Sequence, residues 1–260
     1  MEYLVNEPWL MGLVVGLALA GAIELGRLTS ARFQILEDTD RKDHLVAIRD
    51  GLFVLVSLLL GFTLALAVPR FTERRSLLID EAVSIGTTYL RAGTLPEPYR
   101  THSRQLLREY VDARLDLDNT SLNANQLDEA SRRAKRIQTE LWGEVLVFSQ
   151  SDRSAIAATY INTLNQTIDL HDKRIASMEN RIPLSIWLLI CSVALIAVFA
   201  RGLTLKRRFW LTLVLAPITI AIVVSLVADL DTPSSGLIRL DQRAMQRLKA
   251  DLSNESESSH

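Results

Sequence analysis

The sequence has little cysteine, no excess of charge of either sign and none of the common catalytic motifs. Its single cysteine, Cys191, lies in an apolar run, which excludes an intramolecular disulfide and a cysteine-based metal site. The formal net charge is −1, and residues 70–182 carry 16 basic and 16 acidic side chains. No glycine-rich phosphate loop or Gly-x-Ser-x-Gly elbow is present. We therefore expect no nucleic-acid partner, no cofactor, no bound metal and no catalytic residue.

Charged residues are excluded from four long blocks of the sequence. Residues 51–69, 182–200 and 209–228 contain no charged side chain, and residues 8–23 are equally free of charge until Glu24. A helix of 19 or 20 residues is about 30 Å long, which matches the hydrocarbon core of a bilayer. Because lipid cannot pair with backbone polar groups, these blocks predict four transmembrane helices rather than strands.

The first block is also compatible with a cleaved signal peptide, but residues 1–7 contain no Lys or Arg, which favours a permanent span. The segment between the second and third blocks is polar and helical in its periodicity. We predict helices at 71–92, 98–117, 126–149 and 153–182, with the first and last continuous with the adjoining spans. Their apolar residues recur at three- and four-residue spacing, which is typical of the narrow seams of coiled coils.

The predicted fold is therefore an all-α integral membrane protein with four transmembrane helices and a helical bundle inserted between spans two and three. We divide the chain into residues 1–69 with the first two spans, 70–182 with the bundle, 183–228 with the last two spans, and 229–260. This last segment begins with a turn, continues in an amphipathic stretch at 237–252, and is expected to be polar and disordered at its serine-rich end.

The distribution of basic residues leaves the orientation of the chain open. Both short loops are basic, which favours a cytoplasmic location for them under the positive-inside rule. The inserted segment is also basic at both of its ends. The residues concerned are Arg32, Arg41, Lys42 and Arg49, then Arg201, Lys206, Arg207 and Arg208 in the loops, and Arg70, Arg74, Arg75, Lys173, Arg174 and Arg181 at the two ends.

Small residues at four-residue spacing mark faces on which two membrane helices can approach closely. In the first span these are Gly12, Gly16 and Ala20, and Glu24 is the next residue on that face. Glu24 either pairs with Arg27 near the end of the span or lines an ion path.

The second span has Ser57, Gly61 and Ala65 at the same spacing, with Asp50 just before it. This stripe either packs against another helix or lines a pore in which small residues leave room for water. Asp50, Ser57 and Gly61 therefore join Glu24 as pore or ion-path candidates.

His171, next to Asp169, occupies a seam position of the last bundle helix. The predicted seam of this helix consists of Leu164, Ile168, His171, Ile175, Met178 and Ile182. His171 is either a hydrogen-bonded core histidine or part of a metal-binding or pH-sensing cluster. The second alternative requires Asp80 or Glu81, from the first bundle helix, to converge on it.

A set of short motifs, taken in order, resembles the bacterial bestrophin-like domain family over about residues 45–240. The motifs are Arg49–Leu55, Leu59–Phe62, Asp80–Ala82, Ile85–Thr87, Tyr89–Arg91, Leu95–Glu97, Arg108–Val111, Ile168–His171, Asn180–Pro183, and the exit Asp229–Asp231 with Pro233 and Gly236–Arg239.

The resemblance implies kinship with bestrophins, which are pentameric anion channels with four spans and a long cytoplasmic insertion between spans two and three. It also implies a bacterial inner-membrane location. Bestrophins have an acidic calcium clasp after the last span, where this chain has only Asp229 and Asp231. We therefore expect a homo-oligomer in a lipid bilayer that acts as an ion channel on small ions. The alternative is a non-conducting scaffold or sensor whose bundle binds a partner protein.

Overall fold

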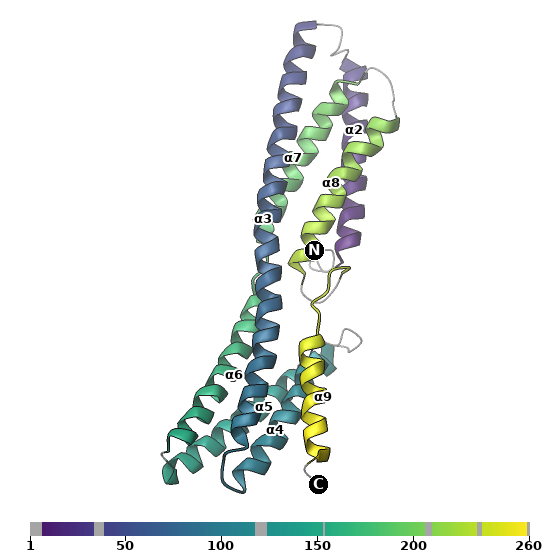
Figure 1. Cartoon of the computed structure of the whole chain (residues 1–260). Helices are drawn as coiled ribbons and strands as arrows, with labels where there is room; N and C mark the ends of the chain where they lie inside the picture. The colour runs from purple at the N-terminus through teal and green to yellow at the C-terminus, as the bar shows by residue number, and fades with distance from the viewer. Residues whose placement is uncertain are drawn as a thin grey trace. The chain divides into compact units, whose positions relative to one another are not determined.

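The computed structural model describes six ranges of the chain, and every regular element within them is a helix. These ranges are 7–33, 39–117, 124–152, 154–205, 210–232 and 236–258. The helices are α2 (Pro8–Phe33), α3 (Thr39–Ala92), α4 (Tyr99–Leu117), α5 (Ala124–Ser151), α6 (Ala155–Glu179), α7 (Leu184–Leu203), α8 (Trp210–Asp231) and α9 (Arg243–Ser258) (Figure 1). The all-α prediction is confirmed for this part of the chain.

Four stretches of helix in the described residues are long and apolar enough to cross a bilayer, as the sequence predicts. They lie in α2, α3, α7 and α8. Together with the loops around them they form unit 1, which comprises Met1–Phe71 and Arg181–Arg239. Unit 2 comprises Thr72–Asn180 and Leu240–His260, so α3 supplies residues to both units.

In unit 1, α2 packs against both α7 and α8 (Figure 1). The core is formed by apolar side chains from all four helices, including Leu19, Leu60, Ala197 and Val224. Gly12 and Gly16 of α2 face α8, as expected for a small-residue stripe. A Cβ placed on Gly12 would lie 2.8 Å from the Cβ of Ser225, and one on Gly16 would lie 3.2 Å from the Cβ of Ala221.

A second close approach joins α2 to α7, and we did not predict it. A Cβ on Gly26 would collide with the carbonyl oxygen of Phe199, and a Cβ on Gly202 would collide with the carbonyl oxygen of Ile23. Because the colliding atoms belong to the backbone, they cannot move aside as a flexible side chain would. Glycine is therefore required at both positions for this helix pair to pack.

In unit 2, residues 72–92 of α3 share a core with α4, α5, α6 and α9. The seams expected for the first and third bundle helices are largely buried. The buried members are Leu78, Ala82, Ile85 and Tyr89 of α3, and Ala130, Ala134, Ile137, Leu141, Val145 and Phe148 of α5. On α6 the expected seam is partly wrong, because Ile175 is 37 % exposed while Thr167 and Arg174 are buried instead.

The structure corrects two further expectations. The last bundle helix does not continue into the third span, because residues 180–183 are not helical between α6 and α7. Pro183 lacks an N–H and disfavours helical geometry at the residue before it, so the chain breaks there.

The serine-rich end is the second correction, since α9 begins in the expected amphipathic stretch and continues through residues 253–258, which we expected to be disordered. Met245, Leu248 and Leu252 of α9 pack into the core of unit 2, which stabilises the helix. Lys206, Arg207 and Arg208 and most of the break expected at 118–125 lie outside the described residues.

Replacing either Gly26 or Gly202 by Ala should weaken the α2–α7 contact. We expect a loss of about 1–3 kcal/mol, because the added methyl group overpacks a backbone contact. The measurement is the thermal unfolding midpoint of the full chain in detergent. Gly21→Ala is the matched control, because a Cβ there meets nothing within 4 Å. An equal response of Gly21→Ala and Gly26→Ala would contradict the assignment.

Candidate functional site

Besides the apolar core that they share, the helices α3 and α6 meet through buried polar side chains. The Thr167 hydroxyl lies 2.9 Å from the Ser84 hydroxyl and 3.0 Å from the Thr88 hydroxyl, and all three side chains are buried. One turn before Ser84 in α3, the buried carboxylate of Glu81 lies against the same face of α6. We refer to this set as the polar seam of unit 2.

Glu81 is the centre of the polar seam, and it binds two arginines from two different helices. Its carboxylate accepts hydrogen bonds from Arg114 of α4, with Nε at 2.7 Å, and from Arg174 of α6 at 2.8 Å. Tyr110 donates a longer hydrogen bond of 3.4 Å, and its own hydroxyl accepts one from Gln138 of α5 at 2.9 Å. The side chains of Glu81, Arg114 and Arg174 are all buried.

A third buried arginine, Arg74, extends the polar seam toward the end of α6. The buried Arg74 side chain of α3 donates to the carbonyl oxygen of Ser177 at 3.0 Å and to that of Asn180 at 2.9 Å. The last carbonyl groups of a helix have no partner within the helix. Arg74 therefore supplies donors and a positive charge where α6 ends, which complements the helix dipole.

The surroundings of Glu81 favour its charged form. Burial acts to raise the pKa of the Glu81 carboxyl, but the polar contact with His171 and the charges of Arg114 and Arg174 outweigh burial. The pKa of Glu81 therefore lies far below its usual range.

His171 and Glu81 belong to this core, whereas the other two predicted members of the cluster, Asp80 and Asp169, do not. The Nδ1 of His171 lies 3.7 Å from a Glu81 oxygen and has no hydrogen-bond partner, and the His171 ring packs against that of Tyr110. Asp80 and Asp169 are exposed on the outer faces of their helices. No three His, Cys, Asp or Glu side chains in the described residues converge as metal ligands would. Glu81 thus converges on His171, as the second alternative requires, whereas Asp80 does not, and the role of His171 stays a prediction.

In unit 1, the predicted carboxylate candidates are paired with neighbouring arginines. Glu24 is half-buried and accepts two hydrogen bonds from Arg27, at 2.6 and 3.0 Å. Asp50 is exposed and pairs with Arg49 at 2.7 Å. The first pair favours the ion-pair interpretation of Glu24 over an ion path.

Ser57 and Gly61 lie on an exposed face of α3, beside a groove of about 570 Å³ between α3 and α8. The walls are mostly apolar, and the hydroxyls of Ser57 and Thr219 are among the few polar groups in it. Ser57 donates to the carbonyl oxygen of Phe53 at 2.9 Å, and a Cβ on Gly61 would meet nothing within 4 Å. In the described part of one chain, Gly61 therefore has no close packing partner on this face.

Asp229 and Asp231, the acidic pair at the end of α8, bind backbone N–H groups. Asp229 accepts from the N–H groups of Leu237 and Ile238, each at 3.0 Å, and the tight turn needs glycine at Gly236, where φ is +118°. Asp231 accepts from the N–H of Ile182, with its two oxygens at 3.0 and 3.1 Å. Both carboxylates are buried and act as structural acceptors, so they do not form an open acidic site.

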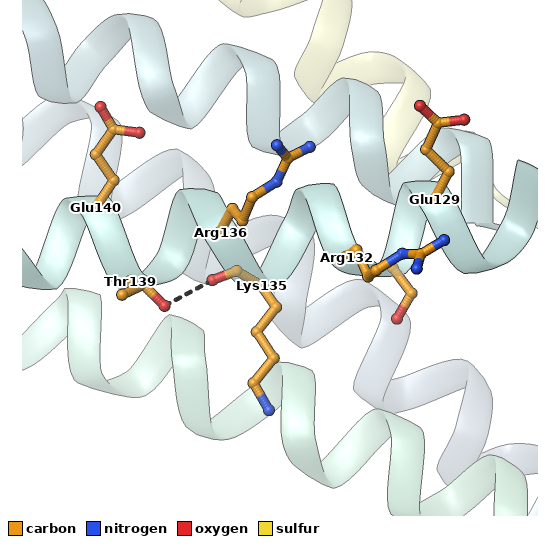
Figure 2. Close-up of a pocket in the computed structure, with 7 residues that line it drawn as sticks. Glu129, Arg132, Lys135, Arg136, Thr139 and Glu140 are labelled. Carbon is orange, nitrogen blue, oxygen red and sulfur yellow. Dashed lines mark hydrogen bonds between the residues drawn. The ribbon is translucent and has the colours of Figure 1, made fainter.

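The outward face of α5 carries a groove of about 900 Å³ with charged walls (Figure 2). Arg136, Glu129 and Glu140 project to one side of the helix, whereas Lys135 projects to the other (Figure 2). Arg132 pairs with Asp128 at 2.9 Å. The charges do not converge on one point, so this face has the character of a hydrated helix surface rather than of a ligand site.

Comparison with known proteins shows which family the chain belongs to. The model of the bestrophin-like domain matches residues 17–245. This chain belongs to the bestrophin-like family. Among curated proteins, none matches the bestrophin-like chain significantly.

Solved structures of a bacterial bestrophin homologue from Klebsiella pneumoniae share the fold. The structure phased with zinc has 15% sequence identity and a TM-score of 0.70, and the match covers 93% of this chain and 97% of that one. A single-mutation variant of the same homologue has 16% identity and a TM-score of 0.70, covering 94% and 98% of the two chains. At this identity the likeness establishes the fold alone.

Sequence reasoning found Glu81 and His171 but missed Arg74, Arg114 and Arg174. A signal for Arg174 was present, because Tyr160, Leu164, Thr167, His171 and Arg174 continue one line at alternating spacings of four and three. Along α6 the residues of this line change from apolar to polar. The spacing of apolar residues alone predicts a different line, through Ile168 and Ile175. The pairing with Arg114 has no comparable signal, since it depends on the packing of α4.

Glu81→Gln should destabilise unit 2 strongly, because it leaves two buried guanidinium groups without a carboxylate. Breaking a buried ion pair from one side costs about 3–5 kcal/mol. The measurement is thermal or denaturant unfolding of the full chain, followed by far-UV circular dichroism. Asp80→Asn, at the exposed neighbouring position, should change stability by less than about 0.5 kcal/mol.

The carboxylate of Glu81 also predicts that acid lowers the stability of the folded chain. Because the folded pKa of Glu81 lies below its ordinary value of 4.5, its stabilisation is complete above pH 4.5 and is lost as the pH falls below it. The wild-type chain should lose more stability than Glu81→Gln between pH 5 and pH 3. Parallel pH profiles for the two proteins would exclude a stabilising role for the Glu81 charge.

Proposed function

We propose that this bestrophin-like chain crosses a bacterial inner membrane four times and that several copies assemble into an ion channel. The unpartnered small-residue face of α3 carries the proposal. Gly12, Gly16 and Gly26 of α2 are packed against α8 or α7. A Cβ on Gly61 of α3, by contrast, meets nothing within 4 Å in the described part of the chain. A helix with small, weakly polar residues on a free face is suited to surround a narrow water-filled path together with its copies.

Membrane insertion is supported by the apolar surface of unit 1. Large side chains such as Leu17, Phe62 and Ile222 are more than 60 % exposed on three different helices. Such a surface is unfavourable in water and suits contact with lipid or with another copy of the chain. Glu24 and Asp50, the charged candidates, are each neutralised by an arginine, so they do not oppose insertion at the ends of the spans.

Family membership supports the channel class, since the kinship is with bestrophins. The conducted ion and the number of subunits belong to the proposal only as a small ion and a homo-oligomer. In this proposal, the helical unit 2, which contains the polar seam, is the part of the chain that lies in water.

Reconstitution in liposomes tests conduction directly. We expect wild-type protein to carry a flux of small ions, and Gly61→Leu to lower that flux by about tenfold or more by placing a bulky apolar group on the pore wall. Gly21→Leu is the matched control, because Gly21 also lies on an exposed face where a Cβ meets nothing within 4 Å. It should leave the flux unchanged.

Two results would contradict the proposal. A monomer in mild detergent has too few helices to enclose a central path. An oligomer with no flux of any small ion would instead support the second class, a membrane scaffold whose helical unit binds a partner protein.

A further inference from the structure

His102, in the first turns of α4, lies between two carboxylates of α5. Its Nδ1 is 2.5 Å from an oxygen of Glu144, and its Nε2 is 3.5 Å from an oxygen of Glu140. The two glutamates are four residues apart and therefore on the same face of α5. The imidazole thus bridges α4 and α5 with one nitrogen directed at each carboxylate.

Only one protonation state of the ring satisfies both contacts. A neutral imidazole has one N–H and one lone pair, so it can donate to one glutamate while its lone pair faces the oxygen of the other. The imidazolium has two N–H groups and donates to both. We propose that protonated His102 is a proton-controlled clamp between α4 and α5, and that loss of its proton as the pH rises loosens this helix pair.

The charges around the ring support the proposal. Glu144 is well buried, with 12% of its side chain exposed, and its second oxygen accepts a hydrogen bond of 2.7 Å from Ser103. Glu140 and Glu109, the latter on α4 itself, are the other charged groups acting on His102. In the described part of the chain, loss of the proton therefore leaves three carboxylates near a neutral ring.

From α6 the titratable group facing this cluster is Tyr160. Burial and the charge of Glu144 raise the pKa of Tyr160 to about 12, so it stays neutral throughout the range in which a histidine titrates. The hydrogen bond to Glu144 and the nearby carboxylates raise the pKa of His102 above its ordinary value of 6.5, in spite of partial burial. The stabilisation from the clamp is thus complete below pH 6.5 and is lost as the pH rises through the higher folded value.

The first experiment compares thermal unfolding of the full chain in detergent at pH 6 and pH 8.5. We expect wild-type protein to lose stability over this interval, and His102→Gln, which has no titrating group, to be less stable than wild type at pH 6 and much less dependent on pH. His44→Gln is the control, because His44 is exposed near the start of α3 in unit 1 and should leave the wild-type profile unchanged. Identical profiles for wild type and His102→Gln would overturn the proposal.

A second measurement keeps the proposal testable if a variant folds poorly. The titration of the His102 ring can be followed by NMR of histidine-labelled protein, with the resonance assigned by its absence in His102→Gln. We expect a midpoint above 6.5 that falls toward 6.5 in Glu140→Gln, where the Glu144 contact remains. A wild-type midpoint at or below 6.5 would show that folding does not favour the protonated ring, and the clamp would then not exist.

Discussion

The helices of unit 2 depend on one buried negative charge and the two arginines that neutralise it. Moving a carboxylate out of water is costly, and the cost is recovered only where opposite charges and hydrogen-bond donors are held in good geometry. Glu81 meets this condition through contacts of 2.7 Å to Arg114 and 2.8 Å to Arg174. Because the three residues come from α3, α4 and α6, none of these helices can shift along its axis without exposing an unpaired charge. An apolar seam, by contrast, tolerates sliding by a turn.

The parts of the fold that follow from hydrophobic periodicity were predictable from the sequence. The buried face of α5, from Ala130 to Phe148, is an example, because apolar residues every three or four positions must be removed from water on one side. The charge-free blocks were equally informative about α7 and α8. The extent of α9 was not, since its serine-rich end has weak local preference for a helix and its first part is held by Met245 and Leu252 in a core formed by distant residues.

The candidate site was only partly predictable, for a related physical reason. Polarity at an unusual position pointed to Glu81, His171, Asp229 and Asp231, and all four are buried. Their partners are determined by long-range packing. Arg114, which binds Glu81, lies on another helix. Asp229 and Asp231 accept hydrogen bonds from backbone N–H groups, which no particular residue type marks in the sequence. Gly26 and Gly202 were missed because a single glycine does not reveal which backbone approaches it.

The contact between Asp231 and the N–H of Ile182 has a consequence for biosynthesis. Ile182 precedes α7 directly, whereas its acceptor is the last residue of α8, 49 residues later. The start of α7 therefore lacks this acceptor until the ribosome has completed α8. The backbone before α7 is consequently fixed to the end of α8 only after both segments of the bestrophin-like chain have been translated.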